Sequence, residues 1–109
     1  MGNLQLRQEV TQLHADLCSA LADPNRILLL YALFEKPRSV NELANELGIS
    51  QPAASRHLKV LRERSLIFAT RQGQSIKYTL KEARIIEALD ILRAVLRDNL
   101  SYRATLISE

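Results

Sequence analysis

The chain has 109 residues, of which 47% are hydrophobic and 25% are charged, with one Cys and no Trp. This length and composition are typical of a single soluble globular domain and exclude disordered and low-complexity proteins. A single cysteine excludes a disulfide framework within the chain. The longest apolar run, residues 27–34, is too short to cross a bilayer, and residues 1–15 lack the apolar stretch of an export signal. We therefore expect a cytoplasmic protein with no membrane partner.

The net charge of +3 is concentrated in one segment. Residues 56–84 contain eight Lys or Arg and two Glu, a net charge of +6, whereas residues 1–55 and 85–109 carry −2 and −1. A concentrated basic segment attracts the phosphate backbone of nucleic acids, although a solvated charged surface has the same composition. Double-stranded DNA is therefore a candidate partner.

The first two predicted elements are helices. Apolar residues recur at intervals of four, three and four at Leu6, Val10, Leu13 and Leu17. This spacing predicts an amphipathic helix over 4–21. Asp23 and Pro24 then start a new helix, because Asp caps it and Pro is tolerated in its first turn. That helix, over 24–35, is apolar nearly all round, so it belongs at the centre of the domain.

Residues 40–64 are predicted to form a helix-turn-helix unit. Ser39 and Glu42 have the spacing of a capping box and start its first helix. Gly48 ends that helix in a left-handed conformation, and Ser50 caps the next one. Two short helices joined by a turn that contains Gly are typical of this unit.

The period changes to two over 65–80, which predicts a half-buried pair of strands. The positions predicted to alternate inward are Leu66, Phe68 and Thr70 in one strand and Ile76, Tyr78 and Leu80 in the other. Gly73, between them, supplies the positive φ that a tight hairpin turn needs.

A final helix is predicted over 81–100. Its apolar stripe consists of Ile85, Leu89, Leu92, Leu96 and Leu100, widened by Ile86 and Val95. This stripe and that of 4–21 exceed what one small domain needs to cover, so we expect these two helices to form a homodimer. The predicted fold class is mainly α with a β-hairpin, about five helices in one domain over 1–109.

Four motifs within residues 20–80 point to a known family. They are Leu21-Ala22-Asp23-Pro24-Asn25-Arg26, Ser39-Val40-Asn41-Glu42-Leu43-Ala44, Gly48-Ile49-Ser50-Gln51-Pro52-Ala53-Ala54-Ser55-Arg56-His57-Leu58, and Arg71-Gln72-Gly73-Gln74 with Tyr78. Together they resemble the ArsR/SmtB family of winged-helix transcriptional repressors. The resemblance implies a winged helix-turn-helix with 65–80 as the wing, dimerised through its terminal helices. It also implies a homodimer that releases DNA when an inducer, often a metal ion, binds.

The helix over 51–64 has one side suited to reading DNA. At about 100° per residue, Ala54, Leu58 and Leu61 share the core side. The opposite side carries amide, hydroxyl and cationic groups, which bind base edges and phosphates. In the family, positions matching Gln51, Ser55 and Arg56 contact DNA. The predicted DNA-binding residues are Ser50, Gln51, Pro52, Ser55, Arg56, His57 and Lys59, with Arg71, Gln72 and Gln74 at the hairpin tip. The alternatives are an ordinary solvated helix side and a simple exposed hairpin.

The usual metal ligands of the family are missing from this chain. Ser39 and Asn41 occupy the slots of its cysteine pair, and residues 81–100 contain no His. We therefore expect no metal site and no cofactor. One alternative stays open: His14 and Cys18 share a helix side and, in a dimer, two copies could assemble a Cys₂His₂ metal site or bring two thiols together, as in a metal- or thiol-responsive sensor. The alternative to sensing is that both are packing residues. No group that would orient a Cys–His nucleophile is evident, so we do not expect an enzyme.

The sequence therefore predicts a homodimeric, sequence-specific DNA-binding repressor with an unidentified inducer. Two-fold symmetry implies a near-palindromic operator with half-sites about 34–36 Å apart. Besides the sensor that uses His14 and Cys18, a second rival is a winged helix that binds proteins and not DNA.

Overall fold

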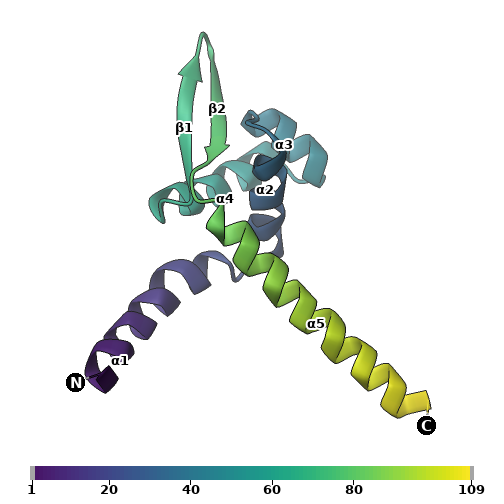
Figure 1. The fold of residues 1–109 in the computed structure, drawn as a ribbon. Coiled ribbons are helices and arrows are strands. Elements are labelled where there is room, and N and C mark those ends of the chain that lie inside the picture. Colours follow the sequence, from purple (N-terminus) through teal and green to yellow (C-terminus); the bar gives the residue numbers. More distant parts are fainter. Residues whose placement is uncertain (1, 109) are drawn as a thin grey trace.

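The computed structural model describes residues 2–108. The helices are α1 (Gly2–Leu13), a π-helical turn η1 (His14–Cys18), α2 (Pro24–Glu35), α3 (Val40–Leu47), α4 (Gln51–Glu63) and α5 (Arg84–Ser108), and the strands are β1 (Ile67–Gln72) and β2 (Ser75–Leu80). Five α-helices and one antiparallel hairpin confirm the predicted fold class. Figure 1 shows a packed unit from which α1 and the far half of α5 diverge like two legs, with the hairpin on the opposite side. We call residues 20–90 the head, and residues 2–19 and 91–108 the arms.

The predicted helix boundaries within the head are confirmed by their caps. The Asp23 carboxylate accepts from the Asn25 backbone N–H at 2.8 Å. The Ser39 hydroxyl and the Glu42 carboxylate form the reciprocal capping box, which satisfies two backbone donors that a helix start leaves free. Gly48 ends α3 at φ 68°, in the left-handed region.

The core of the head is built around α2. Leu29, Leu30 and Leu33 of this helix are buried, as its all-round apolar sequence predicts. They pack with the inward sides of the neighbouring elements, namely Leu43, Leu58, Leu61, Leu66, Ile67, Ile85, Ile86 and Leu89. Burial of one such side chain contributes about 1.5–3 kcal/mol, so this cluster holds the helix-turn-helix and the hairpin in place.

The hairpin corrects one prediction. Its register pairs Ala69 with Tyr78 and Phe68 with Thr79, so Phe68 and Tyr78 lie on opposite faces. The predicted inward positions of Phe68 and Thr70 were wrong, since both side chains are exposed, Phe68 by 44%. Ile76, also predicted inward, shares the face of Tyr78 but is 43% exposed. The cause is Ser65, which adopts φ 62° and turns Leu66 into the core before the strand begins. The alternation therefore starts one residue later than the sequence pattern indicates.

The hairpin is also joined to the start of α3. Arg38 and Tyr78 exchange two backbone hydrogen bonds, of 3.1 and 2.8 Å, in an isolated bridge. At the turn, Gly73 has φ 63°, the positive value expected from the sequence. The wing is thus anchored at its base and free at its tip.

The first predicted helix is not uniform. At residues 14–18 the backbone widens into η1, where the Ser19 N–H bonds to the His14 carbonyl. The Ser19 hydroxyl donates to the Ala15 carbonyl. In a regular α-helix, the Ser19 N–H would donate to that carbonyl. Such back-bonding by Ser bends helices. The last helix also differs from its predicted range of 81–100, because it begins at Arg84 and continues to Ser108.

The two arms have no buried residue among those described. The Cα radius of gyration is 17.0 Å, whereas a compact chain of this length has about 13 Å. The accessible surface is 7879 Å², against about 6,100 Å² for a compact protein of 12.4 kDa. The parts of the predicted apolar stripes that lie on the arms are therefore left uncovered, whereas Ile85, Ile86 and Leu89 of the α5 stripe are buried in the head. No helix among the described residues is long and apolar enough to span a bilayer.

Candidate nucleic-acid interface

Helix α4 is fixed on one side and open on the other. Its start is capped by the Ser50 hydroxyl, which accepts from the Ala53 N–H at 3.2 Å, and Pro52 stands in its first turn. Ala54, Leu58 and Leu61 are fully buried, as the helical wheel predicts. The predicted DNA-binding side chains of the other side are all exposed: Gln51, Pro52, Ser55, Arg56 and Lys59. This arrangement presents hydrogen-bonding and cationic groups to solvent on a rigid helix.

His57 lies differently from the other predicted DNA-binding residues. Its side chain is 17% exposed, and its Nε2 lies 3.9 Å from the Asp23 carboxylate. Its Nδ1 lies 3.3 Å from a guanidinium nitrogen of Arg26. The imidazole therefore faces the start of α2.

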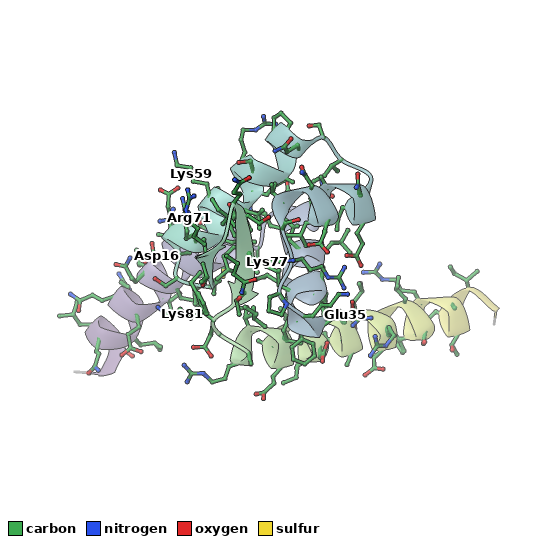
Figure 2. The ribbon with its side chains drawn as sticks, turned by 90° about the horizontal axis from the view of Figure 1, so that it is seen from above. Asp16, Glu35, Lys59, Arg71, Lys77 and Lys81 are labelled. Atoms are coloured by element: carbon green, nitrogen blue, oxygen red, sulfur yellow. The ribbon has the colours of Figure 1, made fainter. Side chains whose placement is uncertain are left out.

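The remaining predicted residues lie at the wing tip. Arg71, Gln72 and Gln74 are exposed beside the Gly73 turn. Seen from above, Lys59 of α4 and Arg71 of β1 lie toward the same side of the molecule, whereas Glu35 lies toward α5 (Figure 2). Long polar side chains at a hairpin tip can follow a phosphate backbone or a minor groove beside the helix.

The basic segment 56–84 separates into two groups in the structure. Three of its cations are paired within the chain: Arg64 with Asp16 at 3.8 Å, Lys77 with Glu42 at 3.1 Å, and Arg84 with Glu82 at 2.7 Å. Within residues 2–108, no side-chain hydrogen bond or ion pair is made by Arg56, Lys59, Arg62, Arg71 and Lys81. The charge that is available to a phosphate backbone therefore lies on α4, on the wing and at Lys81, which directly follows β2.

Lys77 has a different role from that of the cations on α4. Its ammonium donates to the Glu42 carboxylate, which also accepts from the Ser39 N–H at 3.0 Å. The Ser39 backbone bond and the Lys77 bond lower the pKa of Glu42 to about 2. One carboxylate thus joins the start of the helix-turn-helix to the wing. The sequence revealed the capping box but gave no signal that Lys77 would reach it.

Known proteins match this architecture. The model of the bacterial regulatory proteins of the arsR family matches residues 23–67. The biofilm growth-associated repressor of Xylella fastidiosa is 36% identical over 81 residues, which cover 74% of this chain and 71% of that protein. The chain belongs to the arsR family. It is a DNA-binding transcriptional regulator, in agreement with the resemblance seen in its sequence.

Solved structures agree with this assignment to the arsR family. The crystal structure of Rv0081 from M. tuberculosis is 35% identical, with a TM-score of 0.77 over 87% of this chain and 96% of that one. The homodimeric winged helix-turn-helix DNA-binding domain of Mb0332 from Mycobacterium bovis is 23% identical, with a TM-score of 0.75 over 88% of this chain and 89% of that one. The second match shows the fold alone, which is a winged helix-turn-helix.

The structure brings no set of metal ligands together in the part of the chain that it describes. No group of three or more His, Cys, Asp or Glu side chains there could hold an ion. His14 and Cys18 are the first and last residues of η1, and both are exposed. An open groove of about 630 Å³ runs along α2 and α3. Apolar side chains such as Leu28 and Phe34 line it, and none of its lining residues is a Ser, Cys or His.

Proposed function

We propose that two copies of this chain form a homodimer that represses transcription by inserting α4 of each head into successive major grooves of a near-palindromic operator. Gln51, Ser55 and Arg56 read base edges, while Ser50, Pro52 and Lys59 lie beside the phosphate backbone of the DNA. His57, predicted from the sequence to bind DNA, instead faces Asp23 and Arg26 and supports α4 from within the head. Arg71, Gln72 and Gln74 of the wing contact an adjacent groove or phosphates. This regulator is not an enzyme, works in the cytoplasm, and needs no cofactor.

The observation that carries this proposal is the exposed side of α4. Its cations, Arg56, Lys59 and Arg62, have no ion-pair partner within residues 2–108, although other cations of the same basic segment do. Phosphates that neutralise these side chains release counterions, which gives affinity. The amide of Gln51 and the guanidinium of Arg56 can each form two hydrogen bonds with one base, which gives sequence preference.

The uncovered arms support the dimer. Leu6, Val10 and Leu13 of α1 are 48–58% exposed, and Leu92, Val95 and Leu96 of α5 are 50–59% exposed. The accessible surface in excess of a compact chain, about 1,800 Å², is enough for a stable interface. The two arms leave the head in different directions (Figure 1), so each chain can wrap around a second copy. The Mb0332 domain, which shares the fold, is homodimeric.

Repression follows from occupancy of the operator, and a relative that is 36% identical is named a repressor. An inducer, whose identity is open, would act by changing the angle between the two protomers and thus the spacing of the two α4 helices. The alternative is a metal- or thiol-responsive sensor, which would act through the His14 imidazole and the Cys18 thiol.

A selection from random DNA duplexes tests this function. We expect the dimer to enrich a two-fold symmetric sequence with affinity that falls steeply with salt. Arg56→Ala and Gln51→Ala each reduce discrimination by about 1–3 kcal/mol at one position of each half-site. Lys36→Ala is the control, since this exposed cation follows α2 and is outside α4 and the wing.

Two outcomes would contradict the proposal. Selection with no enriched sequence would exclude a sequence-specific regulator. If Arg56→Ala and Gln51→Ala both keep full regulatory function, and the dimer has no salt-dependent affinity for DNA, the winged helix that binds proteins is favoured.

A further inference from the structure

Arg26, in the first turn of α2, connects one arm to helix α4. Its Nε donates to the Ala20 carbonyl at 2.6 Å, and one Nη donates to the Ser19 carbonyl at 3.2 Å. These carbonyls belong to the last turn of the helix that begins as α1. The other Nη lies 3.3 Å from Nδ1 of His57, in the middle of α4. One guanidinium therefore holds the end of the arm and the recognition helix together.

The arm has few other attachments to the head. Within residues 2–108, the ion pair that joins it to the end of α4 is between Asp16 and Arg64, at 3.8 Å and with both side chains at least 40% exposed. Exposed pairs of this kind contribute about 0–1 kcal/mol. Leu17 and Leu21 add partly buried contacts with the core. The forked link through Arg26 is shorter and less exposed than the ion pair.

The chemistry of this link depends on the planar guanidinium. A neutral imidazole accepts at Nδ1 when its proton is on Nε2, and here Nε2 faces the Asp23 carboxylate at 3.9 Å. Asp23 is itself fixed as the cap of α2. Lysine keeps the charge of Arg26, but a point-like ammonium cannot hold two carbonyls and a ring nitrogen in one plane.

We propose that Arg26 is a positioning residue that sets the angle between the dimer arm and α4, and thereby the spacing between half-sites that the dimer accepts. This inference rests on the proposed dimeric function. If the arms form the interface, the orientation of each head relative to its arm determines the distance between the two recognition helices. Arg26 touches no base in this account and acts through His57 and through the carbonyls of Ser19 and Ala20, where the arm joins the head.

The test uses the half-site enriched by the wild-type dimer, placed in a duplex library in which the spacer between two half-sites varies by single base pairs. We expect the wild type to prefer one spacing. Arg26→Lys reduces that preference about fivefold or more, a usual size for coupling between sites, while its affinity for a single half-site stays unchanged. Arg64→Lys is the matched control and keeps the wild-type spacing, because lysine can maintain an exposed ion pair.

The half-site measurement separates a positioning role from a simple loss of stability. A simple loss of stability lowers Tm but leaves the spacing preference unchanged. Should Arg26→Lys fail to fold, His57→Leu removes the link from Arg26 to α4, together with the 3.9 Å contact between His57 and Asp23. It leaves both carbonyl bonds of Arg26, and we expect the same loss of spacing preference. A lost phosphate contact at His57 would weaken binding equally at every spacing.

The outcomes distinguish this inference from the proposed function. A wild-type dimer that enriches no half-site overturns the proposed function and this inference with it. If the wild type has a clear spacing preference and Arg26→Lys leaves it unchanged, the role of Arg26 alone is overturned. If Arg26→Lys does not fold, the same result with His57→Leu overturns that role.

Discussion

The head and the arms carry similar aliphatic stripes but differ in what covers them. In α5, Leu89 is 4% exposed, whereas Leu92, three residues later on the same stripe, is 59% exposed. The change occurs at Asp90, which accepts from the Tyr31 hydroxyl of α2 at 2.5 Å. Desolvation and this bond raise the pKa of Tyr31. The head is therefore stabilised by its own core, whereas the arms would be covered by the second copy that the proposed function requires.

The largest expected effect concerns the core of the head. Leu29→Ala removes a fully buried side chain from α2 and should lower the free energy of unfolding by about 2–5 kcal/mol. Leu28→Ala, at the preceding residue, is the control because the Leu28 side chain is 52% exposed. Urea unfolding measures both, and equal effects of the two variants would contradict the proposed core.

The next effect concerns an arm. Leu96→Asp places a carboxylate on the uncovered stripe of α5, and burial of an unpaired charge in a dimer interface is costly. We expect the dimer dissociation constant to rise about 100-fold or more, measured by sedimentation, with the helical content of the head unchanged. Ser101→Asp adds the same charge on the other side of α5 and should leave the dimer intact. A dimer of Leu96→Asp with wild-type stability would contradict the interface.

A smaller effect is expected where the wing joins the helix-turn-helix. The pKa of Glu42 is lowered from 4.5 to about 2 by bonds from Ser39 and Lys77. This carboxylate therefore contributes its full stability above pH 4.5, and the contribution is lost as the pH falls from 4.5 toward 2. We expect Glu42→Gln to lower Tm at pH 7 and to approach the wild type at acid pH.

Its control is Glu63→Gln, which removes an exposed carboxylate that has no ion pair within the described residues. A constant difference in Tm between Glu42→Gln and the wild type from pH 7 to pH 2 would show that the bonds of Glu42 do not stabilise the fold.

The smallest effect is expected at the arm cysteine. Cys18, the last residue of η1, is exposed and belongs to no group of three ligand side chains in the described part of the chain. Cys18→Ser should change operator affinity less than about twofold, in the presence or absence of zinc or an oxidant. A response to zinc or oxidant that Cys18→Ser abolishes would support the alternative sensor.

Local features of the fold could be predicted because their causes are local. The caps at Asp23, Ser39 and Gly48 each depend on residues within one turn, and the structure confirms all three. The buried side of α4 follows from the periodicity of its apolar residues. The inward phase of β1 could not be predicted, because Ser65 adopts a left-handed conformation that a sequence pattern does not reveal.

The links between distant elements were beyond the sequence. Arg26 and His57 are 31 residues apart, and Lys77 and Glu42 are 35 apart. Only the packing of α2, α4 and the hairpin brings these groups together. The sequence therefore predicted which residues lie on the exposed side of α4. It did not predict which cations are neutralised within the chain.

The most direct test of a head that reads DNA and arms that join two heads compares a full operator with a single half-site. We predict that the wild-type dimer binds the full site about 100-fold or more tightly than the half-site, as expected for two linked heads. Leu96→Asp should bind each half-site with unchanged affinity and lose that advantage. If Leu96→Asp, as a monomer, binds the full site as tightly as the wild type, the division of roles between head and arms is wrong.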